Sequence, residues 1–266
     1  MFKMNVEYQF FRWLICALLS MGLLPNVSHA GSDVQELLAI KVEAQDPKNY
    51  GELINRGKVY KLDSKHTDLL FTYDRRVKQD GLLQISTSYT YDANQVALIQ
   101  VATHDHSYKL NEYFENQYQL GELGSMKLIG TTAAFRLVKN GVEKLAQESV
   151  SLPVVVGPTL VGFVYQHWEK LMAGEVVDFR FAVMSRLETV GFSVQKVTAP
   201  NQQIRIQMKA SSMLIALAVD PIYITFTADR RLLSIEGRVP TKLKQGNKWV
   251  DLDAYVEYHN EAGNFR

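Results

Sequence analysis

The chain has 266 residues, of which 47% are hydrophobic and 21% are charged, and its 29 basic residues nearly balance 28 acidic ones. Removing two of the basic residues and one of the acidic ones with residues 1–30 leaves 27 of each sign. A neutral chain lacks the basic excess that attracts nucleic acid or an anionic membrane surface. We therefore expect neither nucleic-acid binding nor a polybasic membrane tether.

Residues 1–30 have the three parts of a secretory signal peptide. Lys3 and Arg12 give a positively charged start, and residues 13–24 form an apolar run. Ser28-His29-Ala30 follows, with the small residues Ser28 and Ala30 at the two positions that define a signal-peptide cleavage site. The run is too short for a membrane span, which needs about 20 residues. We expect cleavage after Ala30, export to the periplasm, and a mature chain without a transmembrane segment.

The mature chain, residues 31–266, contains no cysteine, because Cys16 lies in the apolar run. It can therefore form no disulfide and offers no thiol chemistry. An exported domain without disulfides depends on its hydrophobic core for stability. The length suits one β-rich domain, and we see no repeat or interdomain linker.

The first mature segments carry mixed signals. Residues 33–43 suit a short helix, with Asp33 as its cap and Glu36 three positions later. Residues 46–61 are polar and contain Pro47, Gly51 and Gly57. We interpret them as an irregular lead-in.

From residue 68 onward the hydrophobic pattern has a period of two, which is typical of strands. Strands are predicted over residues 82–91, 96–103, 113–120 and 126–130. Asn140-Gly141 is a strong hairpin signal that joins residues 134–138 to 142–150. Turn residues recur at the spacing of an antiparallel meander.

Residues 158–173 form the clearest helix pattern, between two strand-like runs. Pro158 suits the first helical position and Gly174 the position just past the end. At about 100° per residue, one face is polar and the other apolar. The polar face holds Tyr165, Gln166, Glu169 and Lys170, and the apolar face holds Leu160, Val161, Phe163, Val164, Trp168, Leu171 and Met172. His167 falls in the apolar stripe, where we interpret it as a structural histidine.

After this helix, strands are predicted over residues 177–183, 204–209, 222–227, 232–238 and 250–258. Periodicity cannot separate a strand from a short helix over residues 213–219. The predicted fold class is mainly β: a curved antiparallel sheet or half-barrel packed on one central amphipathic helix.

The second half of the chain resembles a family of uncharacterised exported proteins of Gram-negative bacteria. The resemblance is carried by GPTLVGFVYQHWEKLMAGEVVDFRFAV (157–183), SRLETVGF (185–192), VDPIYITF (219–226) and IEGRVP (235–240). The whole chain also has a weaker similarity to the half-barrel proteins that carry lipoproteins and lipids across the periplasm. That similarity implies a curved sheet around a helix and an apolar cavity, but it transfers no ligand residue.

Motifs for catalysis and metal binding are weak. His104 and His106 would share one side of a strand, as zinc ligands do, but residues 103–107 are interpreted as a polar turn. A third ligand is unplaced, and His66 and Glu112 are candidates for it. The sequence contains no HExxH motif, phosphate loop or G-x-S-x-G elbow. We expect no catalytic residue, metal or cofactor.

The remaining hypothesis is a non-catalytic carrier of a lipid or other apolar ligand, held between helix and sheet. Its candidate ligand residues are two cations at the mouth, Arg180 and Arg238, and the aromatic residues Trp168, Phe179, Phe181, Tyr223 and Phe226. Ion pairs on a sheet face are the alternative explanation for the two arginines, and core packing is the alternative for the rings. A structural or interaction module of the cell envelope and, third, a hydrolase remain alternative functions.

Overall fold

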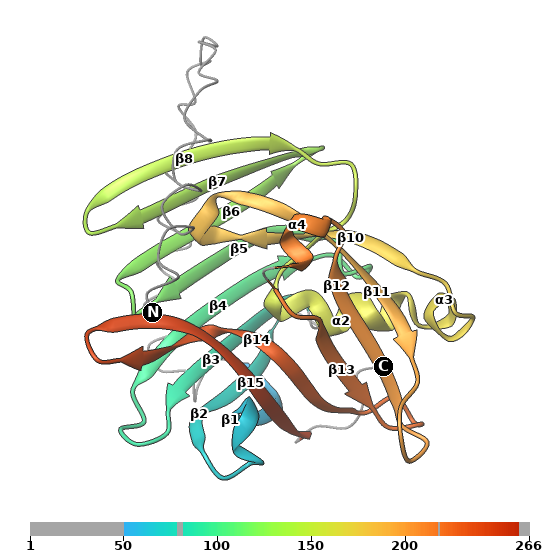
Figure 1. Cartoon of the computed structure of the whole chain (residues 1–266). Coiled ribbons are helices and arrows are strands. Elements are labelled where there is room, and N and C mark those ends of the chain that lie inside the picture. Colours follow the sequence, from blue (N-terminus) through green and yellow to red (C-terminus); the bar gives the residue numbers. More distant parts are fainter. Residues whose placement is uncertain (1–50, 79–81, 218, 261–266) are drawn as a thin grey trace, which may run out of the picture. The chain divides into compact units, whose positions relative to one another are not determined.

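The computed structural model describes residues 51–78, 82–217 and 219–260, which form a single β-sheet with short helices (Figure 1). The strands are β1 Glu52–Lys61, β2 Leu69–Lys78, β3 Leu83–Thr90, β4 Val96–His104, β5 Leu110–Gln117, β6 Glu122–Ile129, β7 Thr132–Lys139, β8 Val142–Ser149, β9 Val154–Val155, β10 Val177–Val183, β11 Glu188–Val197, β12 Ile204–Ala210, β13 Ile222–Phe226, β14 Leu232–Gln245 and β15 Lys248–Asn260. The helices are η3 Leu62–Ser64, η4 Gly157–Thr159, α2 Leu160–Gln166, α3 Trp168–Met172, η5 Met184–Arg186 and α4 Met213–Ala216.

The sheet is a meander in two halves. Its order is β8-β7-β6-β5-β4-β3-β2-β1-β15-β14-β13-β12-β11-β10-β9, so the halves join where β1 pairs with β15. Every pair is antiparallel except β9 with β10. The predicted mainly β fold with an antiparallel sheet is confirmed. The Asn140-Gly141 hairpin is confirmed too, because both residues have positive φ, 51° and 75°, as the tight turn requires.

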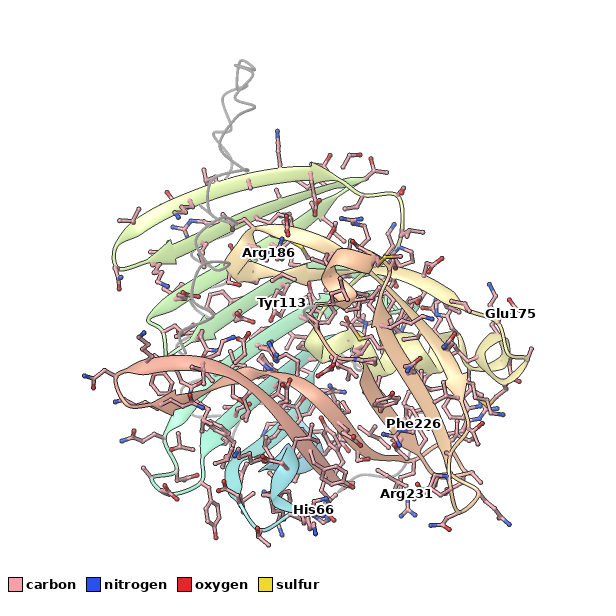
Figure 2. All side chains as sticks on the ribbon, in the orientation of Figure 1. His66, Tyr113, Glu175, Arg186, Phe226 and Arg231 are labelled. Carbon is pink, nitrogen blue, oxygen red and sulfur yellow. The ribbon has the colours of Figure 1, made fainter. Side chains whose placement is uncertain are left out.

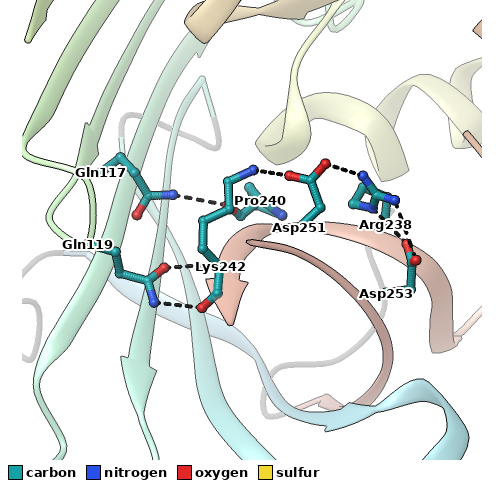
Figure 3. Close-up of polar contacts among 7 residues, drawn as sticks. All are labelled: Gln117, Gln119, Arg238, Pro240, Lys242, Asp251 and Asp253. Carbon is teal, nitrogen blue, oxygen red and sulfur yellow. Dashed lines mark hydrogen bonds and ion pairs between the residues drawn. The ribbon is translucent and has the colours of Figure 1, made fainter. Parts of the chain in front are cut away.

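The sheet curves back on itself at two places. At the first, a register shift between Val239 and Lys242 marks a β-bulge in β14. There Gln117 Nε2 donates to the Pro240 carbonyl at 3.0 Å, and Gln119 exchanges two hydrogen bonds with the Lys242 backbone (Figure 3).

At the second place, β8 meets the start of β11. The Thr189 N–H donates to Glu148 Oε1, and Arg180 pairs with the same carboxylate. These cross-sheet contacts hold the curvature.

The predicted helix over residues 158–173 is interrupted. It consists of η4, α2 and α3, with a break at His167, whose φ and ψ are −101° and 15°. The Nδ1 of His167 lies 2.9 Å from the Phe163 carbonyl, which also accepts the His167 N–H. The side chain therefore competes for a helical acceptor. Gly174 ends the segment with a φ of 87°, as predicted.

The predicted faces of this segment are confirmed except at Tyr165, which was predicted on the polar face but is half-buried and packs against Trp168 and Phe226. Gln166, Glu169 and Lys170 are exposed, whereas six of the seven apolar residues are buried and Met172 is half-buried. The helix core is the cluster they form with buried residues of β10–β14: Phe179, Val190, Phe192, Val194, Ile206, Met208, Ala210, Ile224, Phe226 and Leu232. Full burial of each large apolar side chain contributes about 1.5–3 kcal/mol, so this cluster anchors the second half of the sheet.

The prediction of an irregular segment over residues 46–61 is wrong for its described part, because residues 52–61 form β1. Gly57 weakens the strand pattern of this segment. An added Cβ there would lie 3.2 Å from Val256 Cγ1 and 3.5 Å from Tyr73 Cβ. The side chains of the flanking strands therefore cover the glycine, which a single sequence does not reveal.

The strand β11 was not predicted from the sequence. Residues 213–219, which were expected to form either a strand or a short helix, contain the one-turn helix α4, in which Met213 is 81% exposed. The predicted signal peptide and the predicted helix over residues 33–43 lie outside the described residues. Among the described residues, none of the helices has the length and apolarity of a membrane span.

Candidate functional site

Five polar side chains form a row across β1–β5. Asn55, Arg75, Ser86, Gln100 and Glu115 stand directly opposite one another from strand to strand, so all five project from the same face of the sheet. The first four are 0%, 2%, 2% and 6% exposed, and Glu115 is half-buried. We call these five residues the polar row. Buried polar groups need hydrogen-bond partners, so the partners of this row indicate its role.

Two short hydrogen-bond chains connect the polar row. Arg75 Nε donates to the Tyr73 hydroxyl at 3.2 Å, and this hydroxyl lies 2.8 Å from Ser86 Oγ. At the other end, Gln100 Nε2 donates to the Tyr113 hydroxyl at 2.6 Å, and Tyr113 donates to Glu115 Oε2 at 2.7 Å. Figure 2 labels Tyr113, which is buried, and Arg186, which is exposed.

Arg75 is a buried cation without an acidic partner among the described residues. Its NH1 atom has no hydrogen-bond partner there, and its NH2 has only the Gly157 carbonyl, at 3.5 Å. The carboxylate of the row, on Glu115, is three strands away, or roughly 14 Å. A buried charge without a partner costs several kcal/mol.

The Arg75 guanidinium nevertheless stays protonated. Burial lowers its pKa, but the influence of Tyr73 and Tyr258 is larger in sum, and the pKa lies above its ordinary value. The site therefore holds a fixed positive charge, and the NH1 and NH2 groups of Arg75 can donate further hydrogen bonds. A charged group with such donors can bind an anion.

The pKa values of two other groups are set by burial. Burial raises the pKa of Glu115, although hydrogen bonds from Tyr113 and Gln100 act in the opposite direction. Burial also raises the pKa of the Tyr113 hydroxyl well above its ordinary value. Burial thus shifts the pKa of both groups in the same direction, and Arg75 supplies the positive charge of the row.

Two glycines let the helical segment lie close to the row. A Cβ on Gly157 would come within 3.3 Å of Gln100 Oε1, so η4 touches the middle of the row. A Cβ on Gly162 would lie 2.1 Å from Cε1 of Tyr108, whose ring occupies that space. At Gly157 the segment therefore lies against Gln100 of the row, and at Gly162 it packs against the Tyr108 ring in space that a side chain would need.

The structure separates the predicted ligand residues into groups. Trp168, Phe179 and Phe226 lie together in the helix core, and Phe181 packs on its border, 6.1 Å from Phe192. Tyr223 projects from the other face of β13, where it accepts a hydrogen bond from Gln207.

The two predicted cations are held in ion pairs on the strands. Arg180 is bound to Thr189 and Glu148, on the face of β10 opposite Phe179 and Phe181. Arg238 donates to Asp253 at 2.7 Å and to Asp251 at 2.5 Å (Figure 3). The structure therefore does not bring either arginine together with the aromatic residues of the helix core.

The prediction that His104 lies in a polar turn is wrong. It is the last residue of β4 and is 5% exposed, with Nε2 at 2.8 Å from Gln84 Nε2 and Nδ1 at 2.8 Å from the Asp105 carbonyl. Burial lowers the pKa of His104. Within the described residues, no three His, Cys, Asp or Glu side chains gather as a metal site.

Sequence reasoning missed the polar row. Its one visible signal was the alternation of Gln84, Ser86 and Ser88 with apolar residues, and polar alternation ordinarily indicates a solvent-facing strand. Arg75 gave no signal, because a charge in a strand is ordinarily exposed.

No family model matches the chain, and none of the curated proteins matches it. Among solved structures, the chain is similar to one from Brucella abortus described as a beta-barrel-like protein of the domain of unknown function DUF1849. The two share 10% sequence identity with a TM-score of 0.45, and the match covers 80% of this chain and 100% of that one.

Proposed function

We propose that the protein is an exported, periplasmic, non-catalytic module that binds or carries a lipid or another ligand with a long apolar body. The observation that supports this most is Arg75, a buried cation that has no acidic partner and one unused donor among the described residues. Evolved cores pair or avoid such charges because they are costly. A ligand that supplies an anion and an apolar body would offset that cost.

The surroundings of the polar row suit the apolar part of such a ligand. On one side lies a buried apolar cluster that includes Ala102, Met126 and Phe135, and its member Tyr113 is hydrogen-bonded to Gln100 and Glu115 of the row. On the other side, Tyr73 and Tyr258 border a second cluster built on β1, β2 and β15. A polar strip between apolar surfaces is the complement of an amphiphile.

Accessibility changes along the row in a direction that suits ligand entry. Asn55 and Arg75 are fully buried, whereas Glu115 keeps part of its surface open. We propose that a ligand enters from the Glu115 end and that its polar group reaches Arg75.

The export part of the proposal is supported by the signal pattern of residues 1–30. A space between two membranes is one where amphiphiles need carriers to cross water. Localisation in a periplasmic fraction, with residues 1–30 removed, is the expected result.

The test is to purify the protein from periplasm without detergent, extract it with organic solvent and analyse the extract by mass spectrometry. We expect one class of amphiphile at a near-stoichiometric amount, and micromolar binding of a fluorescent fatty acid by the extracted, refolded protein. A clean extract together with no fluorescent binding would overturn the carrier proposal and favour the interaction module.

A further inference from the structure

We infer that Arg75 is the receptor for a single carboxylate, so the ligand is a long-chain carboxylic acid rather than a neutral or phosphorylated lipid. This inference rests on the proposed function. It goes further because it assigns a binding residue and the chemical class of the ligand's head group.

The free edge of the guanidinium has the geometry that a carboxylate requires. Nε is used by the Tyr73 hydroxyl, while NH1 is unpaired among the described residues and NH2 has only the long 3.5 Å contact to Gly157. The edge formed by NH1 and NH2 is the planar fork that binds both oxygens of a carboxylate. Two parallel hydrogen bonds there would satisfy the donors that the protein leaves open.

The hydroxyl groups beside Arg75 extend the receptor. When the Tyr73 oxygen accepts from Arg75 Nε, its own proton is free for Ser86 Oγ at 2.8 Å. Ser86 then keeps a hydroxyl proton that it can donate to a ligand oxygen. A carboxylate beside Arg75 thus has a charged donor and a neutral donor from neighbouring strands.

Among the described residues, the charged groups near Arg75 favour a ligand with one negative charge. Arg76, the next residue, projects from the opposite face of β2 and donates to the Gly51 carbonyl. Lys242, whose field reaches Glu115, is paired with Asp251 at 2.6 Å. Glu115 in the same row would repel a second negative charge when ionised. One guanidinium therefore balances a carboxylate, whereas a phosphate monoester carries close to two charges at neutral pH.

The experiment compares three ligands that share one sixteen-carbon chain: palmitate, methyl palmitate and hexadecyl phosphate. Each displaces a fluorescent fatty acid from delipidated mature protein. We expect palmitate to bind at least tenfold more tightly than the ester and at least threefold more tightly than the phosphate.

Two variants assign the effect to one side chain. Arg75→Met keeps an unbranched apolar stem without the charge, and we expect palmitate affinity to fall at least tenfold while ester affinity changes less than twofold. Arg186→Met is the matched control, because Arg186 is exposed and paired with Glu188, and both affinities should stay unchanged. Replacing an unpaired buried cation with an apolar residue is neutral or stabilising, so circular dichroism and melting should show a folded Arg75→Met protein.

The outcomes separate the two proposals. Equal affinity of the wild-type protein for palmitate and its ester overturns the carboxylate receptor and leaves the carrier function standing, and it does so even if the Arg75→Met protein fails to fold. A preference for hexadecyl phosphate overturns the single-charge assignment. Binding of none of the three ligands overturns both the receptor and the carrier.

Discussion

Trp168→Ala tests whether the interrupted helix is the central packing element of the second half of the sheet. The indole is 3% exposed, its ring lies edge-on to Phe226 at 5.2 Å, and the Arg230 guanidinium lies 5.2 Å from its centre. A buried tryptophan removes about 200 Å² from water, worth roughly 5 kcal/mol at about 25 cal/mol per Å². Alanine retains part of this, so we expect a loss of about 3–5 kcal/mol, in line with other large-to-small core changes.

Glu169→Ala is the matched control, one residue along the same helix. Its side chain is 80% exposed and its ion pair with Arg230 lies at the surface, so the loss should be less than about 0.5 kcal/mol. With a urea m-value of about 2 kcal/mol per M, Trp168→Ala lowers the unfolding midpoint by roughly 1.5–2.5 M and Glu169→Ala by less than about 0.3 M. Equal shifts would refute the assignment of the buried face.

Three further predictions address the N-terminal segment, the contact between Gly162 and Tyr108, and Glu115 of the polar row. Intact-mass measurement of periplasmic protein should show that residues 1–30 are removed after Ala30; a mass that retains them, or carries acyl chains, would contradict export as a soluble protein. Gly162→Ala should cost about 1–3 kcal/mol by displacing the Tyr108 ring, and a double-mutant cycle should remove most of that cost in a Tyr108→Ala background; additive costs would exclude the proposed clash. The raised pKa of Glu115 means that its contribution is fully present at low pH and is lost as pH rises through that pKa. Glu115→Gln should therefore stabilise the protein at pH 8 more than at pH 5 in urea titrations, and a larger gain at pH 5 would reverse the sign.

The sequence predicted the elements with local signatures. The Asn140-Gly141 turn, the stop at Gly174 and the two faces of the helical segment are each encoded within a few residues, so they could be recognised without a tertiary structure. β1 could not, because Gly57 belongs in a strand only where Tyr73 and Val256 of the flanking strands cover it.

The candidate site was less predictable for the same reason. The residues of the polar row come from five strands, and their alignment depends on register, which periodicity alone does not fix. Arg75 differs from an ordinary surface arginine because η4 contacts it and because no carboxylate pairs with it within the part of the chain that the structure describes. Conversely, Arg180 and Arg238 are both held in ion pairs, Arg180 with Glu148 of β8 and Arg238 with Asp253, the residue opposite it across the β14–β15 hairpin.

The most direct test of the central claim is the protonation of the ligand's carboxyl group beside Arg75. Palmitate labelled with carbon-13 at its carboxyl carbon is bound to the mature protein, and its NMR shift is followed from pH 8 to pH 4. A carboxylate held by a buried guanidinium has a lowered pKa. We therefore predict that the bound resonance keeps the chemical shift of an ionised carboxylate from pH 8 to pH 4. With the Arg75→Met protein, this bound resonance should be absent. A bound resonance that titrates near pH 5, the same in both proteins, would contradict the account.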